Sequence, residues 1–451
     1  METEQSLTRP LFSLESLIRL IVPIMVEQGL AMMIGLADVV MISGVGEAAV
    51  SGVSLVDSVN NLMIQVLSAL SAGGAVVIAQ YLGRQQAEGA REAGKQLVVV
   101  VTLSAMALAA VSALYNGHIL RLLFGGIEAD VMKNARLYFY LSAASYPFLA
   151  VYNSIAGMFR AMGNSKVAMM TSILINFINI GGNALTIYGF HWGVMGAGTA
   201  SLLSRAVAAF VMLRLISSRH NAVWLEFKGK FRFHADMIRR ILNIGIPSGI
   251  ENGMFHIGKL MTQGIIAGFG TAAITANAIA GSVSSMVMVP GSAIGLAMIT
   301  VVGQCMGAGE DNQAAGNVKR MLRMAYGAKA VLGVSVYLLM DWILALFGVE
   351  AVTAELARNI LVSLLVAQLL FWPTAFPLGH ALRATGDVRF TMIISVSTMW
   401  IFRVGFSYLL AVQLHMGVIG VWYAMYIDWV ARTIAFTLRW RGGKWRAMCV
   451  I

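Results

Sequence analysis

Two stretches of the chain decide its fold: residues 21–46 read IVPIMVEQGLAMMIGLADVVMISGVG, and residues 245–270 read GIPSGIENGMFHIGKLMTQGIIAGFG. Placed one above the other, they share a proline, a glutamate four residues after it, and a closing pair of glycines around one apolar residue. The two stretches lie 224 residues apart in a chain of 451 residues. A match at this spacing indicates that the second half of the chain repeats the first.

Further landmarks fall into the same register. Gln80 and Gly83 meet Gln304 and Gly307 at the same offset. With a shift of one residue, two more blocks coincide: Arg160-Ala161-Met162-Gly163 with Arg383-Ala384-Thr385-Gly386, and Gly193-Val194-Met195-Gly196 with Gly417-Val418-Ile419-Gly420. Agreement at so many separate points indicates a duplication of the whole half rather than chance similarity.

The composition places both halves in a membrane. Hydrophobic residues make up 58% of the chain and charged residues only 12%, which is not the composition of a soluble domain. Because about 20 apolar residues cross the bilayer core, we predict twelve spans, at residues 14–42, 50–79, 97–116, 133–158, 168–189, 194–216, 238–266, 274–302, 324–347, 355–382, 390–414 and 417–438. The predicted fold class is an all-α membrane protein with twelve transmembrane helices in two six-helix lobes.

The basic residues alternate between two sets of loops. One set carries Arg84, Arg91, Lys95, Arg160, Lys166, Arg214, Arg219, Lys228, Lys230, Arg232, Arg239, Arg240, Lys319, Arg320, Arg323, Arg383 and Arg389, and the other only Arg121, Lys133, Arg136 and Arg358. Because Lys and Arg near span ends stay on the cytoplasmic side, we expect a multi-pass protein of the plasma (inner) membrane with both termini cytoplasmic. The net charge of +11 is then a topology signal, and we expect no nucleic-acid partner.

The domain organisation follows from the same loops. Residues 217–240 form the one long polar connection, so we predict an N-terminal lobe at 1–216, a cytoplasmic linker at 217–237 and a C-terminal lobe at 238–451. Six spans per half bring both halves into the membrane from the same face, so the repeat is parallel, with its axis along the membrane normal. Two such lobes can rock about a central cleft, and one chain suffices to form it, so we expect a monomer.

Polar residues inside spans are costly in a bilayer and are candidates for function. Glu27 and Asp38 lie 11 residues apart, which returns to within about 20° of the same helix face. Two further stripes follow helical spacing: Asp57, Asn61 and Gln65 in the second span, and Asn176, Asn179 and Asn183 in the fifth. At the equivalent positions of the second half stand Thr262 for Asp38, Gly281 for Asp57, and Trp400, Arg403 and Ser407 for the three asparagines. The acidic lobe is the first one.

Several of these residues also have a structural interpretation. The asparagines could join helices by hydrogen bonds, and Glu27 and Glu251 follow prolines, where freed backbone groups need partners. Arg403, Asp428 and Arg432 could form an ion network between helices. Lys259 could pair with a carboxylate or face the cleft. Cys305 and Cys449 are far apart and have no metal-ligand spacing, so neither a metal site nor a disulfide framework is predicted.

Three blocks carry a resemblance to a known family. They are Pro23…Glu27…Gly35-Leu36-Ala37-Asp38…Gly44-Val45-Gly46, then Gln80-Tyr81-Leu82-Gly83, then Arg160-Ala161-Met162-Gly163-Asn164, and the second half repeats them as Pro247…Glu251, Gly303-Gln304-Cys305-Met306-Gly307 and Arg383-Ala384-Thr385-Gly386-Asp387. In this order the chain resembles the multidrug and toxic compound extrusion (MATE) family over nearly its whole length. The resemblance implies a V-shaped cleft between two six-helix bundles and export of organic cations or other drugs, driven by inward movement of Na⁺ or H⁺.

By position, the resemblance also suggests site residues. Asp38 matches the aspartate that the family uses for cation coupling or protonation, and Asn179 matches an asparagine of the same cluster. Asn183 and Ser201 stand where many relatives have an aspartate and a threonine, so a Na⁺ site at Asp38, Asn179 and Asn183 has one carboxylate fewer. Glu251 falls near an acid used by another branch, at a shorter spacing from Pro247. We expect no cofactor besides the coupling ion, H⁺ or Na⁺, and assign the substrate cleft to Glu27, Asp57, Asn61, Gln65, Asn176, Glu251 and Lys259.

The mechanism expected from these residues is competition. A proton and a cationic, drug-like substrate would compete for one carboxylate, and either would permit the lobes to change orientation within the lipid bilayer. A lipid or lipid-linked precursor flippase of the same superfamily is the alternative, because Arg205, Lys259 and Arg403 could bind a diphosphate. A channel is disfavoured because no pore-lining ring is repeated, and an enzyme because no nucleophile–base or metal constellation recurs in the spans.

Overall fold

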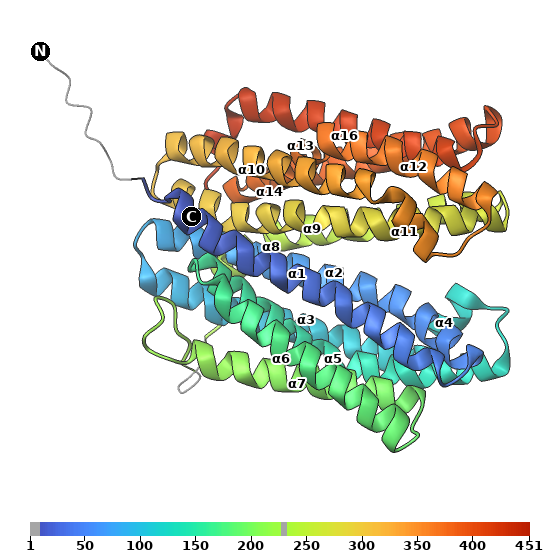
Figure 1. Ribbon diagram of the computed structural model, residues 1–451. Helices are drawn as coiled ribbons and strands as arrows, with labels where there is room; N and C mark the ends of the chain where they lie inside the picture. Colours follow the sequence, from blue (N-terminus) through green and yellow to red (C-terminus); the bar gives the residue numbers. More distant parts are fainter. Residues whose placement is uncertain (1–9, 227–231) are drawn as a thin grey trace, which may run out of the picture.

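The computed structural model describes residues 10–226 and 232–451, so Arg9, Lys228 and Lys230, which were assigned to the basic side, lie outside the described residues. In the first lobe, the helices are α1 (Leu14–Ser43), α2 (Glu47–Gly83), α3 (Ala87–Leu114), the short α4 (Asn116–Phe124), α5 (Ala129–Ala161), α6 (Ser165–Asn183) with its π-helical continuation η1 (Ala184–Gly189), and α7 (Val194–Ile216). Figure 1 shows this lobe in blue to green below the second lobe in yellow to red.

The second lobe repeats the order. It contains α8 (Ala235–Ala267), α9 (Thr271–Gly307), α10 (Asp311–Leu338), α11 (Met340–Leu346), α12 (Ala351–Leu370), α13 (Trp372–Ala375), α14 (Pro377–Thr385), α15 (Val388–Thr398), the π-helical η2 (Met399–Gly405) and η3 (Tyr408–Gln413), α16 (Gly417–Arg441) and η4 (Lys444–Ala447). Over the described ranges the chain is helical with two repeated six-span lobes, which confirms the predicted fold class.

Length and composition alone recognise fewer spans than the fold contains. Within the described residues, eight helices are long and apolar enough to cross a membrane, and the pair α10–α11, bent by 65°, makes a ninth. The other three, α5, α8 and α16, contain charged side chains, such as Glu251 in α8 and Asp428 in α16, that are buried against neighbouring helices. Charge that is satisfied inside the lobe therefore hides these spans from a hydropathy test.

The tenth predicted span, 355–382, was wrong in one respect, because it is not one helix. The chain breaks at Phe371 and again at Phe376, and α13 and α14 each begin next to a proline, Pro373 or Pro377. Proline lacks the N–H that would continue the preceding helix, and its fixed φ suits the first turn of the next one.

The paired glycines of the repeat have a backbone reason. Gly46 and Gly270, at the turn between the first two helices of each lobe, have φ of 134° and 90°. Residues with a Cβ rarely adopt such positive φ values, whereas glycine does so at no steric cost. The same sharp turn is therefore built into both halves of the sequence.

The lobes are joined near one end. Leu17, Leu20 and Ile24, at the start of α1, belong to a core formed mainly by α9, α10 and α14 of the second lobe. Ile241 and Ile244, at the start of α8, belong in the same way to the core of the first lobe. At the opposite end each lobe has a core of its own. The first helix of each lobe thus ties it to the other lobe at the end where the described chain begins, on the left in Figure 1.

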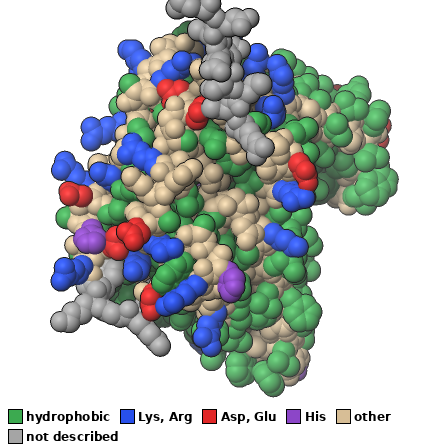
Figure 2. Space-filling model, turned by 90° about the vertical axis from the view of Figure 1, so that its left-hand side faces the viewer, with side chains coloured by type: hydrophobic (Ala, Val, Ile, Leu, Met, Phe, Trp, Pro, Cys, Tyr) green, Lys and Arg blue, Asp and Glu red, His purple; other side chains and the backbone are tan. Residues whose placement is uncertain are grey.

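This joined end is also the basic end. Figure 2 faces it, and Lys and Arg side chains gather there around the loops that follow α2, α5 and α7. The charge segregation agrees with the alternation seen in the sequence, while the cytoplasmic assignment of this face stays a prediction.

The joined end contains a symmetrical contact between α2 and α9. The two helices cross where a Cβ added to Gly83 would lie 2.1 Å from the carbonyl oxygen of Gln304, and one added to Gly307 would lie 2.0 Å from that of Gln80. Each glutamine also reaches across to the other lobe: Gln80 Nε2 donates to the carbonyl of Ala384 at 2.9 Å, and Gln304 Nε2 to that of Ala161 at 2.7 Å. We call these two bonds and the glycine crossing the glutamine seal. Its members are landmarks of the sequence repeat, so both halves of the chain contribute equally to it.

Candidate functional site

The residues suggested by the resemblance come together in the first lobe. Asp38, near the end of α1, accepts a hydrogen bond of 2.5 Å from Asn183 Nδ2 on α6. The same amide nitrogen lies 3.4 Å from Asn179 Oδ1, and Asn179 Nδ2 donates to Ser201 Oγ on α7 at 3.1 Å. All four side chains are at most 9% exposed. We call them the Asp38 cluster, and it contains one carboxylate held by amides alone.

One oxygen of this cluster has no partner. Within the described residues, Asn183 Oδ1 is buried and accepts no hydrogen bond. Asn183 presents its NH₂ group to Asp38, which suits an ionised carboxylate that can only accept. Rotation of the Asn183 amide would present the oxygen instead, which suits a protonated Asp38 or a cation bound beside it. The cluster can therefore satisfy both states of the carboxyl group.

A second polar network lies next to it and was only partly foreseen. Asp57 on α2 accepts from Asn60 Nδ2 at 3.3 Å, and that amide also donates to Ser142 Oγ on α5 at 3.1 Å. Tyr146 OH donates to Asn60 Oδ1 at 2.8 Å. The hydrogen bonds enclose Asn60 on two sides, so it is this residue, rather than the predicted Asn61, that links Asp57 to the lobe interior.

Arg205 supplies the positive charge of this region. Its Nη1 donates to Ser145 Oγ on α5 at 2.6 Å, and it lies near enough to act electrostatically on both Asp38 and Asp57. On α7 it stands one turn after Ser201 of the Asp38 cluster. Sequence reasoning related Arg205 only to a flippase, although its spacing of four residues from Ser201 was a signal that both share one helix face.

The remaining polar stripe of α2 faces outwards. Asn61 and Gln65 are exposed, and neither makes a hydrogen bond within the part of the chain that the structure describes. Beside them, Leu62 and Val66 approach α8 at Gly253 and Gly249, within 3.9 Å of the Cβ positions there. Asn61 and Gln65 therefore border the contact between the two lobes. Asn176, in contrast, is buried and donates to the carbonyl of Ser172 in its own helix at 2.8 Å.

The two glutamates of the repeat sit in matching ion pairs. Arg160 Nη1 lies 3.0 Å and 3.1 Å from the two carboxylate oxygens of Glu27, and Arg383 Nη1 lies 2.9 Å from Glu251 Oε2. Tyr152 OH adds a bond of 3.3 Å to Glu27. Each pair joins the first helix of a lobe to the arginine of that lobe's Arg-Ala-x-Gly block. This placement favours the structural interpretation of both glutamates.

The predicted ion network of the second lobe is confirmed. Asp428 lies 3.3 Å from Arg403 Nε and 2.8 Å from Arg432 Nε, and all three side chains are buried. Lys259, in contrast, is exposed on α8 and makes no ion pair within the described residues. Of its two interpretations, pairing with a carboxylate is thus not what the structure shows.

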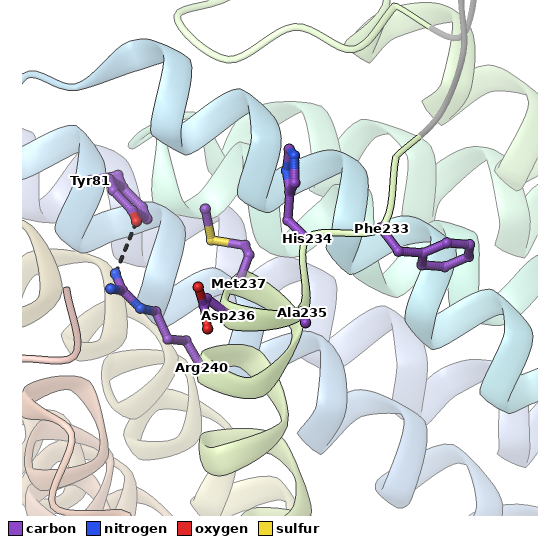
Figure 3. A pocket seen from close by; sticks show the side chains of 7 residues that line it. All are labelled: Tyr81, Phe233, His234, Ala235, Asp236, Met237 and Arg240. Atoms are coloured by element: carbon purple, nitrogen blue, oxygen red, sulfur yellow. Dashed lines mark hydrogen bonds between the residues drawn. The ribbon is translucent and has the colours of Figure 1, made fainter.

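Two surface hollows lie away from the Asp38 cluster. One, of about 320 Å³, is at the joined end and is lined by Tyr81, Phe233, His234, Ala235, Asp236, Met237 and Arg240. In Figure 3 the guanidinium of Arg240 reaches Tyr81 OH, at 3.0 Å, across this hollow. The other, of about 350 Å³, is at the opposite end of the first lobe, around Gly46 and Trp192. Neither includes a residue assigned to the site, and the described residues hold no group of three or more His, Cys, Asp or Glu able to bind a metal.

Comparison with known proteins places this architecture. The uncharacterized transporter YisQ of Bacillus subtilis is 25% identical over 448 residues, covering 98% of this chain and 97% of its own. The probable multidrug resistance protein NorM of Thermotoga maritima is 26% identical, covering 97% and 94%.

Solved structures share the fold. The crystal structure of MATE in the bent conformation superposes with a TM-score of 0.88 at 20% identity, covering 96% of each chain. The outward-facing conformation of a multidrug resistance MATE family transporter of the MOP superfamily superposes with a TM-score of 0.86 at 21% identity, covering 95% of this chain and 96% of the other. The MatE family model matches twice, at residues 23–185 and 247–409, once in each lobe of the repeat. On this double match over most of its length, the chain belongs to the MatE family.

Proposed function

We propose that this protein is a secondary active multidrug efflux transporter, which exports organic cations or other drug-like compounds in exchange for H⁺ or Na⁺. Its family and the names of relatives such as NorM support the transport of drugs. The observation that carries the coupling is the Asp38 cluster: a buried carboxylate inside a span, held by an amide that can reverse, with no ion pair of its own within the described residues. Ionisable groups in such positions are typical of proton and ion pathways.

H⁺ is our first candidate for the coupling ion, with Na⁺ as the alternative. A proton needs only one acceptor, which Asp38 supplies, whereas a hard metal ion needs several oxygens at once. Two oxygens of the cluster, Asn179 Oδ1 and Ser201 Oγ, already accept hydrogen bonds from neighbouring amides. A bound Na⁺ would have to break this chain, while protonation of Asp38 requires only that the Asn183 amide turns.

The substrate would bind between the lobes. Asp57, Asn61 and Gln65 offer a carboxylate and two amides from α2, and Lys259 would border the same space from α8. We assign Glu27, Glu251 and Asn176 to the scaffold, because their polar groups are already engaged within their own lobes. A cationic substrate near Asp57 and Asp38 would favour their charged forms, so its binding and the binding of a proton oppose each other.

The glutamine seal would be the gate on the cytoplasmic side. The seal and the exchanged starts of α1 and α8 hold the lobes together at the basic end, so we take this conformation as open to the outside. The transporter would act as a monomer in the plasma membrane, with both termini cytoplasmic. Its lobes would be residues 1–216 and 238–451, with 217–237 as linker.

The decisive experiment is efflux of a fluorescent organic cation from proteoliposomes under separately imposed H⁺ and Na⁺ gradients. We expect gradient-driven flux that falls to the passive leak in Asp38→Asn. Thr262→Val is the matched control, because Thr262 holds the equivalent place in the second lobe and donates only to the carbonyl of Lys259 in its own helix. Undiminished, gradient-dependent flux in Asp38→Asn would move the coupling role to another acid, Asp57 first.

A lipid or lipid-linked precursor flippase is the second candidate. It is favoured by Lys259, an exposed ammonium without an acidic partner in the described part of the chain, since a phosphate group would neutralise it. Transbilayer movement of a labelled anionic lipid in the same vesicles, lost in Lys259→Met but not in Asp38→Asn, would support this candidate against the drug exporter.

A further inference from the structure

A lysine is buried in the second lobe. Lys329, on α10, is 2% exposed, and its Nζ donates to Gln368 Oε1 on α12 at 2.8 Å. Gln368 Nε2 in turn donates to Ser284 Oγ on α9 at 2.8 Å, and the ring of Trp372 on α13 lies with its centroid 4.0 Å from the ammonium. Four helices thus contribute to one polar site inside the lobe, which we call the Lys329 site.

No anion balances this ammonium within the described residues. The helices packed against α10 are α9, α11, α12, α13 and α14. Their charged or titratable groups, together with those of α10 itself, are Cys305 on α9, Asp341 on α11, Glu355 and Arg358 on α12, His380 and Arg383 on α14, and Asp311, Lys319, Arg320, Arg323, Tyr326 and Tyr337 on α10. The acids among them are Asp341, which pairs with Arg358, and Glu355 and Asp311, which are 13 residues before Gln368 and 18 before Lys329. At 1.5 Å per residue both lie roughly 20 Å or more away along their helices.

The site can satisfy either protonation state. As drawn, the ammonium donates to an amide oxygen and lies over an aromatic ring, a contact worth about 2 kcal/mol when desolvated. A neutral amine is an acceptor as well as a donor. If the Gln368 amide turns over, its NH₂ donates to that amine and its oxygen accepts from the hydroxyl of Ser284. Every member of the chain can thus reverse its role, whereas a charge buried without an anion is costly.

The repeat shows how this site differs from its counterpart. Ser284 and Gln368 are equivalent to Asn60 and Ser145 of the first lobe, and there the buried network binds a cation too, because Arg205 donates to Ser145 at 2.6 Å. At the position of Lys329 the first lobe has Ala105. Each lobe thus places one basic side chain on the same pair of helices. Arginine stays charged in proteins, whereas lysine releases its proton readily when buried.

We propose that Lys329 is a second proton-binding site of this protein, which takes up and releases a proton inside the second lobe through the reversible Lys329–Gln368–Ser284 chain. Its contribution to transport rests on the proposed antiport: one proton would be carried at Asp38 and another at Lys329. Proton binding by Lys329 does not depend on that function and can be measured without a substrate.

The test uses the tryptophan ring under the ammonium. Full-length protein in nanodiscs is titrated from about pH 5 to about pH 10, the interval between buried and free lysines, while tryptophan fluorescence is recorded. A charge 4.0 Å from the Trp372 ring changes its emission, so we expect a reversible step in the wild type. The step should be absent from Lys329→Met and from Lys329→Arg, whose charge does not titrate, and from Trp372→Phe. It should persist in Lys259→Met, which removes an exposed lysine of the same lobe.

The outcomes separate this inference from the proposed function. Loss of the step in Lys329→Arg, which keeps the charge and the approximate volume, supports the site even if Lys329→Met fails to fold. A titration curve that is the same in the wild type and in Lys329→Arg overturns the proposal, whatever the flux assay shows. If the step is present and persists in Asp38→Asn while no gradient drives efflux, the proposed antiport fails and the proton site stands.

Discussion

Asn183 is the residue on which the identity of the coupling ion turns. It donates to Asp38 and stands where many MATE relatives have an aspartate, so Asn183→Asp would place two carboxylates side by side. Like charges this close are unfavourable unless a cation or proton sits between them. We expect Asn183→Asp to make efflux dependent on Na⁺, measured as drug efflux with and without Na⁺ at fixed pH. Asn176→Asp, on the same helix but bonded to its own backbone, should not change the ion dependence. Equal ion dependence of Asn183→Asp and the wild type would mean that the cluster does not contact the ion.

Arg160 tests whether Glu27 belongs to the scaffold. Removing one partner of a buried ion pair leaves an uncompensated charge, which typically costs about 3–5 kcal/mol. We expect Arg160→Met to lower the unfolding temperature clearly, and Arg383→Met, which leaves Glu251 alone, to do the same. The double variant Arg160→Met, Glu27→Gln should recover much of the loss. If Arg160→Met is as stable as the wild type but loses efflux, Glu27 acts in transport instead.

At the scale of elements, the crossing of α2 and α9 depends on two glycines. A Cβ at Gly83 would lie 2.1 Å from the carbonyl oxygen of Gln304, which is backbone and cannot move aside. Gly83→Ala should therefore force the two helices apart. We expect a lower unfolding temperature and altered efflux, whereas Gly281→Ala is the matched control because nothing lies within 4 Å of its added Cβ in α9. That control should be neutral or stabilising by up to about 1 kcal/mol. Equal behaviour of the two variants would show that the crossing is not tight in the membrane.

At the scale of the whole molecule, the glutamine seal holds the two lobes in one relative orientation. Each of its hydrogen bonds contributes about 1 kcal/mol net, so removing both in Gln80→Leu, Gln304→Leu should shift the balance between the two orientations by roughly thirtyfold. Spin labels at Leu122 on α4 and Leu346 on α11, exposed at the end of each lobe that has its own core, would report the distance between them by double electron–electron resonance.

We expect the distance distribution of this double variant to move towards shorter values without any ligand. Gln96→Leu is the control, because the Gln96 amide bonds only Glu92 in its own helix and the carbonyl of Arg232 before α8. An unchanged distribution in the double variant would assign the seal to packing rather than to gating.

The sequence by itself determined the two-lobe repeat, most of the spans and the basic end, because duplication, apolar length and loop charge are properties of consecutive residues. It also identified Asp38, Asn179 and Asn183 as neighbours through family motifs, and these side chains do meet. It missed the breaks at Phe371 and Phe376, although Pro373 and Pro377 were visible signals.

Only the tertiary structure decided which polar groups are satisfied and which are free. Glu27 finds Arg160 across 133 residues of sequence, and Lys329 finds Gln368 across 39. Helical periodicity places a side chain on one face of its own helix but does not identify the helix opposite. Whether a buried charge meets an anion, an amide or an aromatic ring depends on how twelve helices pack together, and that packing separates the scaffold glutamates from the carboxylate and the lysine proposed to carry protons.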